Sequence, residues 1–320
     1  MKLQTQIPLY KAEHQIDYSS KLLLLGSCFS ENIGAKLDYF KFQTVQNPFG
    51  ILFHPLVIEN LISRAVNKKY YTEEELFFLN ERWHCFDAHS SLSDSSKEKL
   101  LGNLNAKLVK TENELRESTH IIITLGTAWV YKETETGKTV ANCHKVPQAA
   151  FEKHLLSVTE IGASLNRIAE VVQTINLKAQ IIFTISPVRH LKDGFVENQR
   201  SKSHLITAIH EMLSVPALEV MGYYFPSYEI LMDELRDYRF YSNDMVHPNE
   251  LAVDYIWEKF QQVWIVDEVK APMKKVAEVQ KGLQHRPFNP KGLEHQKFQM
   301  VLQERIMYLK KVFPFMEFNS

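Results

Sequence analysis

Three almost continuously apolar stretches, residues 22–25, 120–125 and 180–185, most constrain how this chain can fold. A strand that is apolar at nearly every position is buried on both faces, whereas a strand with one solvated face alternates apolar and polar residues. Segments with apolar residues at helical spacing follow the strands. Buried strands that alternate with amphipathic helices indicate a mainly parallel sheet covered on both faces, which is a three-layer α/β/α sandwich.

Periodicity and capping signals predict the other elements. Two serines, Ser95 and Ser157, are each followed three residues later by a glutamate, which is the pattern of a capping box. Each is therefore the expected N-cap of a helix. The full prediction has helices after Ser27, after His54, from Ser95 to about Leu115, after Ser157, over residues 201–213 and from Pro248, and short strands over residues 43–45, 75–79, 82–86, 129–131, 139–141 and 218–224.

The sequence changes character after about residue 265. Lysines there alternate with acidic and apolar residues, and Pro287 and Pro290 interrupt the pattern. This predicts two amphipathic helices. We therefore expect an α/β domain over residues 1–265 and a helical appendage over residues 266–320 that packs on it.

The charge balance and the N-terminal sequence exclude some broad classes of function. The chain has 320 residues with 37 Lys+Arg against 38 Asp+Glu, so it lacks the basic field that binding to nucleic acid or to a membrane surface requires. Residues 1–20 contain no apolar signal-peptide core, and the leucine run at 22–25 is too short for one or for a membrane span. We expect a cytoplasmic protein, and the sequence leaves its oligomeric state open.

The cysteines and histidines suggest neither a metal site nor a cofactor. Cys28, Cys85 and Cys143 are scattered, without a Cys-x-x-Cys pair, and the 13 histidines form no His-x-x-x-His pattern with nearby acids. No metal ligand and no cofactor are therefore predicted.

Ser27 follows the first buried strand at the start of a helix, where a tight turn presents its side chain. A serine hydroxyl becomes a nucleophile only when a positioned base removes its proton and an acid orients that base. Asp244 and His247 fit these two roles, because a spacing of three residues lets the carboxylate reach imidazole Nδ1 while Nε2 faces outward. Ser27, His247 and Asp244 are the predicted nucleophile, base and acid.

Cys28 is the alternative nucleophile, since a helix N-terminus lowers the pKa of a thiol. It lies one residue past the turn, so its side chain should point away from the direction of Ser27. We therefore prefer Ser27.

The fold class also predicts where the site lies. Ligands of parallel α/β sheets bind beyond the carboxyl ends of the strands. This rule brings residues 26–27, 47–50, 126–127 and 186–187 to one rim. We expect the site where these four turns meet.

Four blocks of this sequence resemble those of a known family. Residues 25–30, Leu-Gly-Ser-Cys-Phe-Ser, are similar to the signature of the GSCFA family, which is named after a Gly-Ser-Cys-Phe-Ala motif and belongs to the SGNH (GDSL-like) hydrolase superfamily. Residues 47–50, 142–145 and 244–248 also resemble blocks of that family. The resemblance covers roughly residues 20–260.

The resemblance implies a flavodoxin-like SGNH hydrolase fold, with Ser27 as nucleophile and Asp244 and His247 as the Asp-x-x-His pair. In SGNH enzymes the oxyanion hole combines the N–H of the nucleophile, a glycine after the second strand and an asparagine after the third. The N–H groups of Ser27 and Gly50 would then be the first two donors.

The third oxyanion donor is where this sequence departs from the superfamily. Ala128 stands where the Gly-x-Asn-Asp block has its asparagine. Asn142, from the neighbouring hairpin, is the first candidate to replace it, and Thr127 is a weaker one. An asparagine at a hairpin end equally well bonds its own backbone, so both readings of Asn142 stay open.

Together these features predict an SGNH-type serine esterase that removes O-acyl or O-acetyl groups from a small-molecule or glycan ester through an acyl-enzyme. Asn47, His144 and Lys145 are the predicted substrate-binding residues, the last two for an anionic group. The same triad would serve an acyltransferase if a sugar hydroxyl accepted the acyl group. The alternative from another class is a hydrolase-fold binding protein with little activity, which the missing asparagine would permit.

Overall fold

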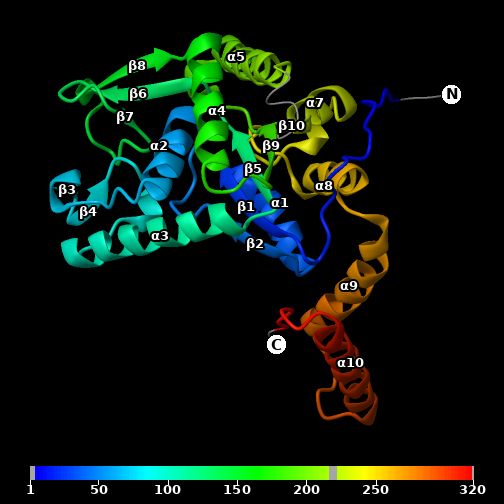
Figure 1. The fold of residues 1–320 in the computed structure, drawn as a ribbon. Coiled ribbons are helices and arrows are strands. Elements are labelled where there is room, and N and C mark those ends of the chain that lie inside the picture. Colours follow the sequence, from blue (N-terminus) through cyan, green and yellow to red (C-terminus); the bar gives the residue numbers. More distant parts are fainter. Residues whose placement is uncertain (1–3, 216–221, 319–320) are drawn as a thin grey trace.

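A five-stranded parallel sheet forms the centre of the computed structural model, which describes residues 4–215 and 222–318 (Figure 1). The strands lie in the order β10-β9-β5-β1-β2, and every neighbouring pair is parallel. Counted along the chain among these five, the order is 2-1-3-4-5, the flavodoxin-like arrangement. The predicted fold class is confirmed. The strands are β1 (Lys21–Gly26), β2 (Gln43–Gln46), β5 (His120–Leu125), β9 (Gln180–Ile185) and β10 (Gly222–Phe225).

Helices cover both faces of the sheet. Successive side chains of each strand point to opposite faces, so the sheet contributes to two separate hydrophobic cores. Leu23 and Leu25 of β1 belong to one cluster of buried residues, whereas Leu22 and Leu24 belong to the other. The first cluster is completed by α2 (Pro55–Val66), α3 (Lys97–Glu117), α4 (Val158–Gln173) and α5 (Phe195–Leu213), and the second by α1 (Cys28–Tyr39) and α8 (Glu250–Trp264).

Two small antiparallel sheets project from one side of this sandwich (Figure 1). One pairs β3 (Leu76–Leu79) with β4 (Arg82–Cys85), and the other joins β6 (Trp129–Glu133), β7 (Thr139–Val140) and β8 (Phe151–Leu155). Both predicted strand pairs are confirmed. The sequence did not predict β8, because its residues Phe-Glu-Lys-His-Leu are mostly polar and it lies at the edge of its sheet.

Some predicted boundaries are wrong by a few residues. The N-cap of α3 is Ser96 rather than Ser95, since Ser96 Oγ accepts a hydrogen bond from the Lys99 N–H. Helix α5 begins at Phe195, before residue 201. The sequence did not predict its first turns, because Phe195 and Val196 are followed by four polar residues that give no apolar stripe. Helix α8 begins after Pro248, with Asn249 as its N-cap. The capping box at Ser157 is confirmed. Residues 218–221 of the last predicted strand lie outside the described residues.

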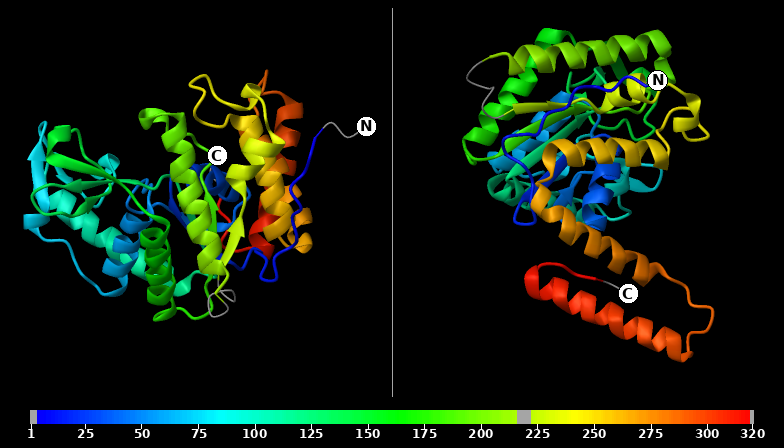
Figure 2. Two further views of the ribbon diagram at one scale, coloured as in Figure 1. Left: turned by 90° about the horizontal axis from the view of Figure 1, so that it is seen from above. Right: turned by 90° about the vertical axis from the view of Figure 1, so that its right-hand side faces the viewer.

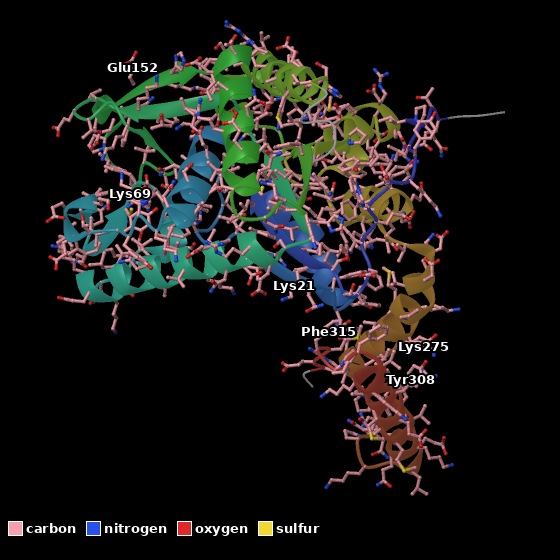
Figure 3. The ribbon with its side chains drawn as sticks, viewed as in Figure 1. Lys21, Lys69, Glu152, Lys275, Tyr308 and Phe315 are labelled. Atoms are coloured by element: carbon pink, nitrogen blue, oxygen red, sulfur yellow. The ribbon has the colours of Figure 1, made fainter. Side chains whose placement is uncertain are left out.

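The two predicted C-terminal helices are confirmed as α9 (Lys270–Gln284) and α10 (Leu293–Val312), which lie side by side and extend from the sandwich (Figure 2). The Lys275 ammonium lies 4.1 Å from the ring centre of Tyr308, which joins the two helices (Figure 3). Gln280 Nε2 donates to the carbonyl oxygen of Tyr39 at 3.0 Å, so α9 packs against the end of α1. The division of the chain at residue 265 stays a prediction.

The N-terminal segment is tied to the end of α8. The Ile16 N–H donates to the Trp264 carbonyl oxygen at 2.6 Å, and the Val266 N–H donates to the Ile16 carbonyl oxygen at 3.1 Å. Ile16 and Ile265 thereby form a parallel bridge. This bridge closes the side of the sandwich that holds the second core, to which both isoleucines belong.

Gly26→Ala is expected to destabilise the protein by more than about 2 kcal/mol. Gly26 has a φ of +134°, and an added Cβ would lie 2.1 Å from the Thr124 carbonyl oxygen, so the methyl group strains the turn and pushes β1 from β5. Gly102→Ala in α3 is the matched control, because no atom lies within 4 Å of the added Cβ. It should stabilise the protein by about 0.5–1 kcal/mol. Urea unfolding measures both, and an unchanged stability of Gly26→Ala would contradict this account of the turn.

Candidate active site

Ser27 occupies the turn between β1 and α1, where it is the N-cap of the helix. Its Oγ accepts a hydrogen bond from the Phe29 N–H at 3.3 Å, and its own N–H donates to the Thr124 carbonyl oxygen at 3.0 Å. The residue has 0% exposed surface. The predicted nucleophile is therefore fixed at the carboxyl end of the sheet and closed off from solvent.

Asp244 and His247 form a bonded pair on the loop before α8. Asp244 Oδ2 lies 2.7 Å from His247 Nδ1, and Asp244 Oδ1 accepts hydrogen bonds from the N–H groups of Val246 and His247. These bonds, those from the two backbone N–H groups first, lower the pKa of Asp244 to about 2. The carboxylate therefore stays ionised at neutral pH and orients an imidazole that is about half exposed, with side-chain accessibility of 47%.

The serine and the pair are not bonded to each other. Ser27 Oγ and His247 have no hydrogen bond in the part of the chain that the structure describes. The loop that carries the pair is joined to the segment after β9, because the Arg189 N–H donates to the Val246 carbonyl oxygen at 3.1 Å. The arrangement therefore has an assembled acid–base pair and a separate serine on one rim.

The loop after β2 is tied to the serine turn by two hydrogen bonds and is closed by a third within itself. Asn47 Oδ1 accepts from the Gly26 N–H at 2.9 Å, and the Leu52 N–H donates to the Gly26 carbonyl oxygen at 2.9 Å. The Gly50 N–H donates to the Asn47 carbonyl oxygen at 2.7 Å. Asn47 thus holds the turn in front of Ser27, and the N–H of Gly50 is engaged within its own turn.

Residues 126–129, which follow β5, form the third-strand block, in which Ala128 stands at the position of the missing asparagine. The side chain at this position points into the core. Ala128 is fully buried in the first core, and its N–H donates to Ser201 Oγ at 2.7 Å. Thr127 Oγ1 lies 3.1 Å from the same Ser201 oxygen and accepts from the Trp129 N–H. Asn142 Oδ1 accepts from the His144 N–H at 2.8 Å, which leaves its amide Nδ2 without a protein partner among the described residues.

His144 and Lys145 differ in their surroundings. The His144 ring is buried, its Nε2 lies 2.8 Å from the Cys85 carbonyl oxygen, and burial first of all lowers its pKa to about 4. At neutral pH this ring therefore carries no charge with which to hold an anion. Lys145 is exposed, at a backbone φ of +63°.

Lys202 is a site residue that the sequence analysis missed. It is fully buried on α5, and its Nζ donates to the carbonyl oxygens of Gly126 and Ser186, each at 2.7 Å. Burial lowers its pKa to about 7. The sequence did contain a signal for its burial. Lys202 lies at helical spacing from Leu205 and Ile209, so a lysine occupies the face of the helix that is otherwise apolar.

His190, also missed, lies against the third-strand block. Its Nε2 is buried without a hydrogen-bond partner and would lie 3.0 Å from a Cβ at Gly126. Burial, and then the charges of Lys202 and His247, lower its pKa to about 3. The ring is therefore neutral and within electrostatic reach of both groups. No periodicity marks it, because it lies in the loop after β9.

The surroundings of Cys28, the alternative nucleophile, do not activate its thiol. Burial, and then the charge of Glu31, raise the pKa of Cys28, which favours the unreactive thiol.

No group of three His, Cys, Asp or Glu side chains that could hold a metal occurs within residues 4–215 and 222–318. Over the same residues, no helix is long and apolar enough to cross a membrane.

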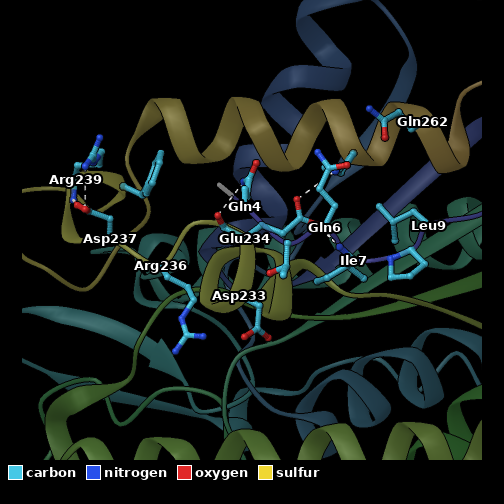
Figure 4. A pocket seen from close by; sticks show the side chains of 14 residues that line it. Gln4, Gln6, Ile7, Leu9, Asp233, Glu234, Arg236, Asp237, Arg239 and Gln262 are labelled. Carbon is cyan, nitrogen blue, oxygen red and sulfur yellow. Dashed lines mark hydrogen bonds and ion pairs between the residues drawn. The ribbon is translucent and has the colours of Figure 1, made fainter. Parts of the chain in front are cut away.

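One cavity lies between the N-terminal segment and residues 233–240, and Ser27 is not among the residues that line it (Figure 4). Its volume is about 1270 Å³. The buried Glu234 in its wall accepts hydrogen bonds from the Ile7 N–H and the Tyr255 hydroxyl and pairs with Lys259 at 3.2 Å. The buried carboxylate of Glu234 is therefore paired within the protein.

Comparisons with known proteins agree with the resemblance noted in the sequence. Residues 21–260 match the model of the GSCFA family, and residues 276–320 match that of the GSCFA domain protein, C-terminal domain. No curated protein sequence matches this chain. An acetyl xylan esterase (Est2A) from the rumen bacterium Butyrivibrio proteoclasticus aligns with a TM-score of 0.37 and 12% identity, over 77% of this chain and 64% of its own.

Lys202→Met should change how stability depends on pH. The folded pKa of Lys202 is about 7, whereas an unfolded lysine titrates near 10.4, so between these values the unfolded state binds more protons. The free energy of unfolding of the wild type should therefore rise, relative to Lys202→Met, by about 2 kcal/mol from pH 7 to pH 9. Urea unfolding at the two pH values measures this. The exposed Lys110→Met is the control, and a parallel response of all three proteins would contradict the buried, cation-disfavouring site.

Proposed function

We propose that this chain, which belongs to the GSCFA family, is a serine acyl-ester hydrolase that removes O-acyl groups, acetyl above all, from a carbohydrate-like or other small ester. Ser27 would be the nucleophile, His247 the general base and acid, and Asp244 the group that orients His247. The observation that carries the proposal is the 2.7 Å bond between Asp244 Oδ2 and His247 Nδ1, because it leaves Nε2 as the free basic nitrogen.

The proposed reaction has two steps. Ser27 Oγ attacks the ester carbonyl carbon while His247 Nε2 accepts the hydroxyl proton, and Asp244 stabilises the resulting imidazolium. The tetrahedral intermediate collapses as the alcohol leaves with that proton, and the acyl group stays on Ser27. Water then attacks the acyl-enzyme, His247 accepts a proton from it and returns that proton to Ser27, and the acid is released.

The reaction requires an open form of the site. Ser27 has no exposed surface, and the N–H groups of Ser27 and Gly50 are bonded to the Thr124 and Asn47 carbonyl oxygens. An oxyanion gains these two donors only when the turn at residues 47–50 and the end of β5 shift. Substrate binding would supply the free energy for that shift, as in enzymes whose site is completed on closure around the substrate.

The closed serine also favours a second candidate function. A hydrolase-fold binding protein would keep the rim and the bonded pair, yet never expose Ser27. The acyltransferase variant of the first proposal uses the same residues, with a sugar hydroxyl in place of water in the second step. Product analysis separates hydrolase from transferase, because only the transferase yields a new ester.

Ser27→Ala and His247→Ala are expected to lower kcat for 4-nitrophenyl acetate by about ten-thousandfold or more, and Asp244→Asn by about a thousandfold or more, since these groups act as one unit. A fluorophosphonate probe should label wild type on Ser27, located by mass spectrometry of the modified peptide. Cys28→Ala is the matched control one residue away, and it should retain both labelling and turnover.

Two results would decide against the esterase. Labelling that survives in Ser27→Ala would mean that another residue is the nucleophile. A folded wild type that is neither labelled nor active after long incubation would favour the binding protein instead.

Asn142→Ala tests the proposed third oxyanion donor. If its free amide Nδ2 bonds the oxyanion, removal should lower kcat roughly tenfold to hundredfold and leave KM nearly unchanged, because this bond strengthens in the transition state. Thr127→Val is the corresponding test of the second candidate. An unchanged kcat in Asn142→Ala would assign Asn142 to its backbone bond with His144 alone.

A further inference from the structure

Arg189 lines a pocket beside the loop that carries Asp244 and His247. The bond from its backbone N–H to the Val246 carbonyl oxygen fixes the base of the side chain next to His247. The pocket has a volume of about 200 Å³ and lies between this residue, the segment after α7 (Ser227–Glu229) and the loop before α8. Its lining residues include Arg189, Arg236, Tyr238 and Tyr241.

Two tyrosine rings hold the guanidinium of Arg189. Its Cζ lies 4.1 Å from the ring centre of Tyr241 and 5.5 Å from that of Tyr238. Arginine stacks on aromatic faces in this way. The guanidinium also donates a hydrogen bond to the Tyr241 hydroxyl, and its other N–H groups are available for a ligand. The side chain is therefore ordered before a ligand arrives, which reduces the entropic cost of binding.

No carboxylate forms an ion pair with Arg189 within the described ranges. The acidic side chains of the neighbouring loop are engaged elsewhere, since Asp237 pairs with Arg239 at 3.0 Å and Asp244 with His247 at 2.7 Å. Figure 4 shows the Asp237–Arg239 pair, with Arg236 pointing away from it. Arg236 likewise has no ion pair in this part of the structure. Asp237 also lines the pocket, but it is paired with Arg239, so the two arginines leave the pocket with a net positive charge.

Part of the wall is apolar. Leu231, Met232 and Leu235 line it, and the first and last of these are buried. An apolar wall lowers the local dielectric and strengthens the attraction between an arginine and an anion. A volume of about 200 Å³ is below that of pockets that enclose whole ligands, so it suits one charged group of a larger molecule.

We propose that this pocket binds an anionic group of the substrate, a carboxylate or a phosphate, and that Arg189 determines this specificity. The role in catalysis rests on the proposed esterase function. Binding of the anion does not, because none of the groups that form the pocket belongs to the Ser27, Asp244 and His247 set. A substrate held there would present its ester toward His247.

Binding is tested first, by calorimetric titration of the full chain with inorganic phosphate and, separately, with 4-hydroxybenzoate. At least one of them should bind, and Arg189→Leu should weaken that binding at least tenfold. The affinity of Arg189→Lys should lie between those of wild type and Arg189→Leu, because lysine keeps the charge but cannot form the paired hydrogen bonds of a guanidinium. The exposed Arg286→Leu removes the same charge outside the pocket and should bind like wild type. Phosphate alone would point to a phosphorylated substrate, and 4-hydroxybenzoate alone to a carboxylate. Binding of neither, or equal binding by Arg189→Leu, would overturn the proposal.

Catalysis is tested by comparing phenyl acetate with 4-acetoxybenzoate, which differs by one carboxylate. Wild type should favour the anionic ester, and Arg189→Leu should lower kcat/KM for it by roughly tenfold to hundredfold, mainly through KM, with phenyl acetate unaffected. An equal loss for both esters would contradict a specificity role. If neither ester is cleaved and Ser27 is not labelled, the esterase proposal fails, and the titrations still decide whether the pocket binds anions.

Discussion

A single buried ammonium group holds the rim of this sheet together. Strands β5 and β9 leave their ladder at Gly126 and Ser186, and Lys202 Nζ bonds both of the freed carbonyl oxygens. A buried cation without a carboxylate partner is costly, so its retention here indicates that the strand ends must be kept together. The same helix brings Ser201 to the N–H of Ala128, and the rim turns therefore depend on α5 being in place.

This dependence explains the missing asparagine in physical terms. The side chain at position 128 lies in the first hydrophobic core, where an amide would lose its hydration without gaining a partner. Ser201 already satisfies the backbone N–H at that position. An asparagine side chain at position 128 is thus incompatible with the way this chain packs α5, which leaves Asn142 and Thr127 as the proposed substitutes.

The fold could be predicted because its signals are local. An apolar strand and an amphipathic helix are each visible within ten or so residues, and the three central strands lie where their apolar runs predict them. The Asp244–His247 bond is local as well, since three residues suffice to form it. Lys202 and His190 could not be assigned to the rim in this way, because their environment is created by residues far away in sequence. The closure over Ser27 has the same origin, and no pattern around residue 27 indicates it.

The bridge between Ile16 and Ile265 has a consequence for the order of events during synthesis. The segment that bears Ile16 can bond early to β5, through the His14 carbonyl oxygen and His120, but its bridge to Ile265 forms only after α8 has been made, so the second core closes late in synthesis. Contacts between such distant parts of a chain form slowly and expose apolar surface in the meantime. One face of the sheet would therefore stay partly uncovered until α8 is made, and the synthesis of α8 rather than strand pairing would set the time at which the second core is completed.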